Sequence, residues 1–336
     1  MLLPKESYKE ISLLNTEKIL AKAFNSGMYS FIIHFGVYEV EDPSIPVSVM
    51  CGCANSALRT IRESLTRFVA YFNDDIKRKV LLEQTVIGSF EEALAGGEFQ
   101  MYLQPLCKAD GTAIGAEALV RWQKKDGTMI MPCDFIETLE HAGLIQKLDL
   151  YMWELAVKQL SRWKQENSDL SISVNMSALD FYSIDVYRTL NDLIERYGVE
   201  SRNLRLEITE TALLVDPAKS DAVVSSLRER GFLVEIDDFG KGYSSLSLLK
   251  TIRSDILKID MHFLQEIRND SRSAQILSSI IQLAESLGMD VIAEGVETKE
   301  QLHTLIEMGC MYFQGYYFSR PIPVSEFEQN YLSHLS

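Results

Sequence analysis

The segment Phe232-Leu-Val-Glu-Ile-Asp-Asp-Phe-Gly-Lys-Gly242 joins an apolar run to two adjacent carboxylates and a glycine-rich turn. The run predicts a buried strand, and Asp237 and Asp238 stand where that strand ends. Aspartate is common in turns and at helix N-caps, so the pair alone is weak evidence for a site. The glycines at 240 and 242 let the backbone bend sharply away from the acids. What matters is therefore which other side chains end up beside this pair.

Short apolar runs alternate with helix-like segments from residue 86 to residue 336. This alternation is typical of a β/α fold with parallel strands. The predicted strands are 99–105, 114–120, 170–175, 203–208, 232–237, 256–259, 290–293 and 313–318. Eight strands in a segment of this length predict the α/β class and a (β/α)8 TIM-type barrel.

Helical spacing of apolar residues marks the segments between the strands. One predicted face is Trp153, Ala156, Val157, Leu160 and Trp163, and a second is Ile276, Ile280, Leu283, Ala284 and Leu287. Gly288 and Gly309 suit helix ends, and Thr298 with Gln301 forms a predicted capping box.

Residues 1–85 have a different pattern, which predicts a small N-terminal α+β segment. We expect strands at 30–37 and 68–72, a helix at 54–68 and a helical connection near 77–83. The segment is short for a complete domain.

Polar side chains stand near the ends of six predicted strands. In Leu204–Thr209, the residues Leu204, Leu206 and Ile208 fall on one side, whereas Glu207 falls on the other. In a closed barrel that second side faces the interior, where an ionised glutamate is costly unless it is paired or bound to a metal. The corresponding strand-end residues are Glu117, Asn175, Glu207, Asp237, Asp238, Lys258, Asp260 and Glu294.

The oxygen-bearing members of this group predict a metal site. Glu117, Asn175, Glu207, Asp237 and Asp238 offer oxygen ligands with no neighbouring His or Cys, which favours Mg²⁺ or Mn²⁺ over zinc. Two ions would relieve the repulsion between the adjacent aspartates, with Asp237 bridging. Two metals about 3.5–4 Å apart are the usual arrangement for attack on a phosphodiester.

The overall charge and the cysteines restrict the remaining possibilities. The net charge of −15 disfavours nucleic-acid polymers and anionic membranes as partners. No apolar run is long enough for a membrane span, and no signal-peptide pattern is present. Five cysteines without a paired framework indicate a reducing, cytoplasmic location.

Eight motifs together resemble the EAL-type cyclic di-GMP phosphodiesterases. Glu117-Ala-Leu119 is the name-giving motif, and the matching blocks follow in order over residues 86–321. They are YLQP (102–105), EALVRW (117–122), SVNMS (173–177), LEITE (206–210), DDFGKGYSSL (237–246), LKID (257–260), AEGVET (293–298) and QGYYFSRP (314–321).

The resemblance implies a modified barrel that hydrolyses cyclic di-GMP to linear pGpG with two Mg²⁺ or Mn²⁺ ions, in bacterial second-messenger signalling. It implies metal ligands at Glu117, Asn175, Glu207, Asp237 and Asp238, and catalytic roles for Glu294, Lys258 and Gln314. It further implies substrate contacts by Gln104 and Arg121, Glu210 as the anchor of the loop after Asp238, and a homodimer formed through the barrel. Lys258 also has a simpler interpretation as a strand-end ion pair.

Two positions near the motifs need separate interpretation. Lys241 stands where the family usually has threonine, which puts loop dynamics and dimer geometry in question but not metal binding. Glu297 is close to the predicted ligands, but we interpret it as a solvated acid favoured by the following helix dipole.

Residues 1–85 weakly resemble the second half of a GGDEF diguanylate-cyclase domain whose signature is missing. The sequence Ala95-Gly-Gly-Glu-Phe99 imitates that signature but belongs to the entry into the barrel. Cyclase activity is therefore not expected, and a packing remnant is favoured over a regulatory module.

Two other functions remain open from the sequence. The chain is either an enzyme or a cyclic di-GMP receptor that has lost catalysis, although none of the motif residues is missing. A different metal-dependent barrel, such as an enolase-type lyase, would use a Lys or His base without the adjacent Asp pair. The scattered histidines do not suggest an HD-type phosphodiesterase.

Overall fold

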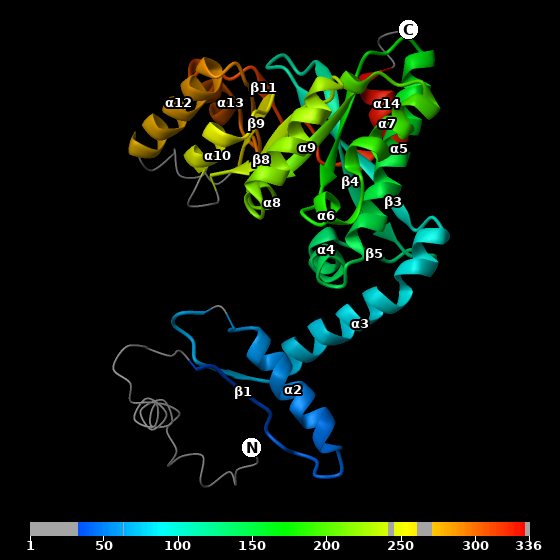
Figure 1. The fold of residues 1–336 in the computed structure, drawn as a ribbon, viewed down its shortest axis with the longest axis vertical. Helices are drawn as coiled ribbons and strands as arrows, with labels where there is room; N and C mark the ends of the chain where they lie inside the picture. Colours follow the sequence, from blue (N-terminus) through cyan, green and yellow to red (C-terminus); the bar gives the residue numbers. More distant parts are fainter. Residues whose placement is uncertain (1–32, 63, 241–244, 261–270, 333–336) are drawn as a thin grey trace. The chain divides into compact units, whose positions relative to one another are not determined.

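The structure is a computed structural model that describes residues 33–62, 64–240, 245–260 and 271–332 (Figure 1). The chain divides into two compact units, Met1–Gly88 and Ser89–Ser336. None of the helices in the described ranges is long and apolar enough to cross a membrane.

The first unit contains a parallel pair of strands, β1 (Phe35–Val37) and β2 (Val69–Tyr71), and the helix α2 (Val47–Arg59). A side chain at Gly36 would meet the backbone oxygen of Ala54 at 1.9 Å, so glycine allows the strand to approach the helix. The predicted helix 54–68 was wrong in its bounds. The helix begins after Pro46 and ends at Arg59, where the Thr60 and Ile61 amides donate to the Ala57 and Leu58 carbonyls in tighter three-residue turns.

The helix α3 (Asp74–Ala95) includes the predicted helical connection near 77–83, which is confirmed. Asn73 caps its start, since the Asn73 side chain accepts from the Ile76 backbone amide at 2.9 Å. The strand predicted at 30–37 is described only from residue 33 onward.

Eight strands of the second unit form a closed barrel within the described residues. Their order around the ring is β3 (Phe99–Cys107), β11 (Tyr312–Phe313), β10 (Asp290–Ala293), β9 (Ile256–Ile259), β8 (Leu233–Phe239), β7 (Leu204–Thr209), β6 (Ser171–Met176) and β4 (Ala113–Gln123). Two short strands extend it: β5 (Met129–Ile130) pairs with β4, and β12 (Ile322–Pro323) pairs with β3. The predicted (β/α)8 barrel is confirmed.

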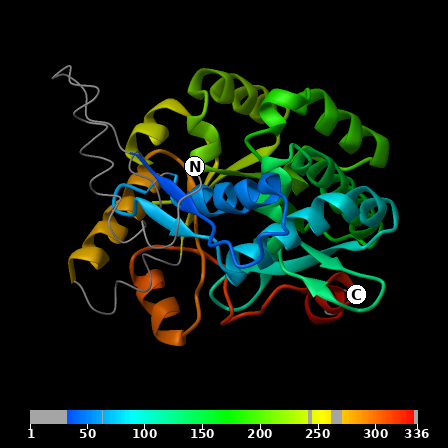
Figure 2. The ribbon, with the colours of Figure 1, turned by 90° about the horizontal axis from the view of Figure 1, so that it is seen from below.

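Helices lie around the outside of the strands (Figure 2). In chain order they are α4 (Pro132–His141), α5 (Ile145–Gln165), α6 (Asp180–Ser183), α7 (Val186–Tyr197), η1 (Ser201–Asn203), α8 (Glu210–Leu214), α9 (Pro217–Glu229), α10 (Ser245–Thr251), α12 (Ser271–Ser286), α13 (Lys299–Glu307) and α14 (Val324–Tyr331).

The expectation of parallel strands throughout was wrong for β3. This strand is antiparallel to both β4 and β11. Only the turn at 108–112 connects β3 to β4, with Gly111 donating to the Lys108 carbonyl. A parallel neighbour would need a crossover of a dozen or more residues, so this short connection enforces a hairpin.

The predicted strand 313–318 was too long. β11 ends at Phe313: the Gln314 amide still donates to Ala293 of β10, but the contacts that follow are with the loop after β10. Val296 donates to the Gln314 carbonyl, and Tyr317 donates to the Val296 carbonyl. This arrangement brings Gln314 beside the loop after β10.

The helix signals were confirmed for α5 and α13 and were out of phase for α12. The predicted α5 face is buried, and Thr298 with Gln301 forms the expected capping box. On α12 the buried residues are Leu277, Ile281 and Ala284, whereas Ile276 is 45% exposed. The predicted stripe was therefore displaced by about one residue at its N-terminal end.

The alternation predicted for β7 is confirmed. Leu204, Leu206 and Ile208 are fully buried between the sheet and the helices, and Glu207 lies on the barrel's interior side. The sequence thus places an acid inside a barrel whose outer layer is apolar.

Candidate active site

Lys258 of β9 lies at the centre of a cluster of carboxylates in the barrel interior. Its Nζ lies 2.6 Å from Glu294, 2.9 Å from Glu207, 3.4 Å from Glu117 and 3.7 Å from Asp237. These acids come from or directly follow β10, β7, β4 and β8, so strands distant in sequence meet at one point. The side chain of Lys258 is only 1% exposed, and its cost of burial is offset by these four partners.

The charges in this cluster shift one another's pKa values. Burial raises the pKa of Glu294 to about 8, although the ammonium of Lys258 opposes the shift. Burial also raises the pKa of Glu207, and the carboxylate of Glu117 adds to the effect. For Lys258, burial would lower the pKa, but the surrounding carboxylates raise it well above its usual value. Glu294 can therefore exchange a proton near neutral pH while Lys258 keeps its charge.

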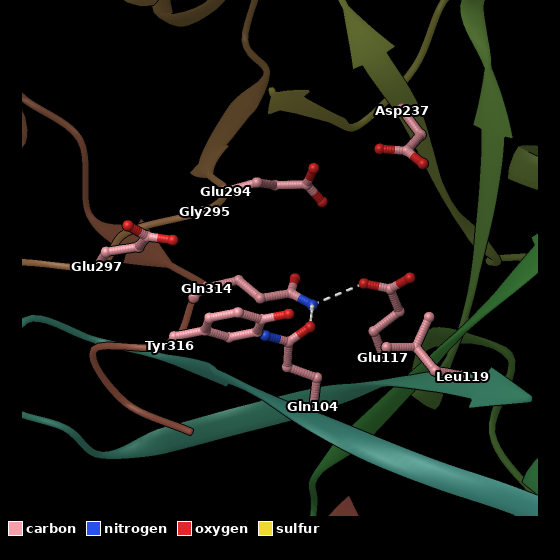
Figure 3. A pocket seen from close by; sticks show the side chains of 10 residues that line it. Gln104, Glu117, Leu119, Asp237, Glu294, Gly295, Glu297, Gln314 and Tyr316 are labelled. Atoms are coloured by element: carbon pink, nitrogen blue, oxygen red, sulfur yellow. Dashed lines mark hydrogen bonds between the residues drawn. The ribbon is translucent and has the colours of Figure 1, made fainter. Parts of the chain in front are cut away.

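Glu117, Asp237 and Glu294 of this cluster line a pocket of about 310 Å³ (Figure 3). Gln314 links two of its walls, because its Nε2 donates to Glu117 Oε2 at 2.6 Å and to Gln104 Oε1 at 3.2 Å. Gln104 in turn donates to the carbonyl of Ser319 at 3.3 Å. The lining residues are Gln104, Glu117, Leu119, Asp237, Glu294, Gly295, Glu297, Gln314, Gly315 and Tyr316.

A β-bulge explains how two consecutive aspartates can serve one side of a strand. Ile236 pairs with Leu257, but Phe239 pairs with Ile259, so β8 has one residue more than β9 over this interval. Asp238 adopts φ of +57°, and its N–H donates to the Asp237 carboxylate at 2.8 Å. The residues that flank the pair face the outer core, which leaves both acids to the interior side.

The loop after the bulge is connected to Glu210 at the start of α8. The Gly240 N–H donates to Glu210 Oε2 at 3.5 Å, and Glu210 is 2% exposed. Lys241 and Gly242 lie outside the described residues. Glu297 is exposed, precedes the N-cap of α13 and also lines the pocket.

In the described part of the chain, neither Asn175 nor Arg121 forms a hydrogen bond or ion pair with Lys258, although Asn175 of β6 pairs in register with Glu207 of β7. Asn175 is exposed near the end of β6, and its carbonyl accepts from Trp153 Nε1 at 2.9 Å. Arg121 follows Glu117 and Leu119 on the same face of β4, with its guanidinium 5.7 Å from the centre of the Tyr102 ring. Burial lowers the pKa of Arg121, opposed by nearby Tyr102, Tyr316 and Glu117. β4 thus carries a cation two residues beyond Leu119, which lines the pocket.

A second layer of charge, which was not predicted from the sequence, lies around Glu235. Glu235 is fully buried on β8, and its Oε1 lies 3.4 Å from both Arg205 Nη1 and Ser173 Oγ. Burial raises its pKa, whereas Arg205 and Lys258 lower it. Glu235 is two residues before Asp237 and therefore lies on the same face of β8. This spacing could have predicted an inward-facing acid, but Glu235 stands within an apolar run and was interpreted as part of a buried strand.

The donor set fits a hard divalent cation. In the described ranges no three His, Cys, Asp or Glu side chains already form a metal-binding group, since the carboxylates converge on Lys258. However, Glu207 Oε2 is buried without a well-oriented hydrogen bond, and the converging donors are all oxygens. Oxygen donors of this kind suit Mg²⁺ or Mn²⁺.

The family model that describes the EAL domain matches residues 87–321 of this chain, which is more than half of its length. The chain belongs to the EAL domain family.

Relatives and solved structures agree with this assignment. The signaling protein YkoW of Bacillus subtilis is 37% identical over 311 residues, covering 87% of this chain and 39% of YkoW. The cyclic di-GMP phosphodiesterase RocR of Pseudomonas aeruginosa is 32% identical, covering 83% of this chain and 71% of RocR. The PaMucR phosphodiesterase in its c-di-GMP complex is 33% identical, with a TM-score of 0.69, covering 72% of this chain and 99% of that one. This chain spans about two fifths of the length of several curated relatives that it matches.

Proposed function

We propose that this EAL-family chain is a metal-dependent phosphodiesterase that hydrolyses cyclic di-GMP to linear pGpG by two-metal activation of water. The observation that carries the proposal is the convergence of Glu117, Glu207, Asp237 and Glu294 on Lys258 beside a pocket. The names of RocR and PdeR, both cyclic di-GMP phosphodiesterases, support the choice of substrate.

In this proposal, Glu117, Asn175, Glu207, Asp237 and Asp238 would hold two Mg²⁺ or Mn²⁺ ions, which would supply positive charge for the substrate phosphate and acidify water. Glu294 would take up the proton as the general base. Lys258 compensates the negative charge, and Gln314 orients Glu117 through its hydrogen bond.

Substrate recognition is assigned to Gln104 in the pocket wall and to Arg121, which follows the lining residue Leu119 on β4. Gln104 is held by Gln314 and Ser319, so its orientation is fixed before substrate enters. The Arg121 guanidinium suits bidentate contact with a phosphate. Glu210 holds the loop after the bulge through the Gly240 amide.

Product analysis by chromatography tests the proposal. Purified protein with Mn²⁺ and cyclic di-GMP is expected to form linear pGpG, and Glu117→Ala and Glu294→Ala are expected to lose at least about a hundredfold of the rate. Glu195→Ala, which removes a carboxylate that is 61% exposed, serves as the control with unchanged rate. Binding without product would instead support a receptor, and turnover by both site variants at the wild-type rate would overturn the site assignment.

We also propose that the protein acts in the cytoplasm as a homodimer formed through the barrel. Support for the compartment comes from the five cysteines, all of which are free. The dimer rests on the family resemblance and is tested by light scattering. Residues 1–85 are assigned as a packing remnant related to GGDEF domains, without cyclase activity.

A further inference from the structure

The helix α5 holds the segment around Asn175 directly at one place and through α6 at a second. Trp153 Nε1 donates to the Asn175 carbonyl at 2.9 Å. One helical turn earlier, and hence on the same face of α5, Asp149 meets Asp180 of α6. Asp180 Oδ2 accepts from the Ser177 backbone amide at 2.8 Å. The backbone on both sides of Met176 is therefore held by groups that lead back to α5.

Asp149 and Asp180 form a buried pair of carboxyl groups. Asp180 is fully buried and Asp149 is 9% exposed. Burial raises the pKa of Asp149 well above its usual value, and the charge of Asp180 and the hydrogen bond between the two carboxyls add to this. Burial likewise raises the pKa of Asp180. Two carboxylates in contact cannot both be ionised without strong repulsion.

Hydrogen bonds from Ser177 favour the ionised form of both acids and offset only part of this repulsion, since the pKa of each acid stays raised. Glu140 of α4 is a further acid that raises the pKa of Asp149. The described residues place no Lys, Arg or His in an ion pair with either carboxyl. Asp149 Oδ2 and Asp180 Oδ1 are buried, and neither has a well-oriented hydrogen-bond donor among the described residues. A proton on one of the two carboxyls supplies a donor at this place.

We propose that Asp149 and Asp180 share one proton and that this pair positions Asn175 at the barrel mouth. The positioning half rests on the proposed function, since it takes Asn175 to be a metal ligand. Asp149 is then a positioning residue that acts through Asp180 and the Ser177 amide. Outer groups that orient a metal ligand typically change metal affinity about 10- to 100-fold when they are removed.

Infrared difference spectroscopy at neutral pH tests the shared proton without any metal. Subtracting the spectrum of Asp149→Asn from that of the wild type is expected to leave the C=O band of a protonated carboxylic acid. The control is Asp192→Asn, whose carboxylate is 58% exposed beside Arg188 and should give no such band. Absence of the band in the Asp149 difference spectrum would overturn the proposal.

Mn²⁺ affinity, measured from the free ion by electron paramagnetic resonance, tests the positioning role. Asp149→Asn keeps a donor toward Asp180 and is expected to bind Mn²⁺ like the wild type. Asp149→Ala removes the donor and is expected to lose about 10- to 100-fold in affinity. Equal affinity of both variants would overturn the positioning role, and so would equal loss in both.

The two readouts separate this inference from the proposed function. If the wild type binds no Mn²⁺, the proposed function and the positioning role both fail, whereas the infrared band still decides whether the proton is shared. If Asp149→Ala does not fold, Asp149→Asn still decides the outcome, because loss of Mn²⁺ affinity in that isosteric variant contradicts the positioning role.

Discussion

At the scale of single residues, we expect the largest loss of stability on replacement of Lys258. Replacing it in Lys258→Met leaves four carboxylates around an uncharged side chain, and removing one partner of a buried ion pair costs about 3–5 kcal/mol. Denaturant unfolding in the presence of a chelator measures this loss. Lys158→Met is the control, because that lysine is 50% exposed beside Glu154 and should cost less than about 1 kcal/mol. Equal costs would show that the cluster does not depend on its cation.

The raised pKa of Glu294 predicts how the stability of the protein changes with pH. Its folded-state pKa of about 8 lies above the usual 4.5, so the folded protein holds a proton that the unfolded chain releases in this window. The stabilisation is therefore complete at low pH and is lost as pH rises from about 4.5 to about 8, with a slope of up to about 1.4 kcal/mol per pH unit. Melting temperatures in chelator should fall less steeply for Glu294→Gln than for the wild type. Parallel profiles would contradict the assignment.

At the scale of elements, Gly115 controls the pairing of β4 with β6. A Cβ there would lie 2.4 Å from Ser171 Oγ and 2.8 Å from the Ser171 carbonyl oxygen. Gly115→Ala is therefore expected to push the two strands apart and destabilise the protein by about 1–3 kcal/mol, measured by denaturant unfolding.

The matched control is Gly88→Ala in α3, where an added Cβ meets nothing within 4 Å. Alanine in a helix interior is favoured over glycine, so this variant should be neutral or stabilised by up to about 1 kcal/mol. If both variants shift stability in the same direction, crowding between β4 and β6 is not the cause.

The elements that could be predicted were those with strong local patterns. Alternation on β7 and the capping box at Thr298 depend on nearest neighbours in sequence, and both are present. The antiparallel direction of β3 and the early end of β11 depend on contacts between distant segments, such as Val296 with Gln314. Local pattern carries no information about such pairings, which explains why those two predictions were wrong.

At the scale of the whole molecule, burial divides the cysteines into two classes. Burial raises the pKa of Cys107 to about 12 and of Cys310 to about 11, so both remain unreactive thiols at pH 8. Cys51 and Cys133 are exposed and Cys53 is half-buried. Iodoacetamide followed by mass spectrometry is expected to label these three in the native protein and the buried pair only after denaturation. Rapid native labelling of Cys310 would contradict the barrel packing.

The convergence of the site could be predicted because the carboxyl ends of barrel strands share one mouth. The central place of Lys258 among four acids could not, since inward direction alone does not say how far each side chain reaches. Glu235 was missed for the opposite reason. Its apolar neighbours on both sides made a buried acid resemble part of an ordinary strand.

The strand β4 fixes the distance between a carboxylate and a guanidinium group. Glu117, Leu119 and Arg121 share one face of a single strand, so the separation from carboxylate to guanidinium is fixed by the strand's rise rather than by a loop. Four residues at about 3.3 Å each place the two Cα atoms roughly 13 Å apart. A ligand that contacts both Glu117 and Arg121 must be long enough to span this distance. Discrimination between ligands by size would then depend on the strand geometry of the barrel and would be insensitive to changes in the surrounding loops.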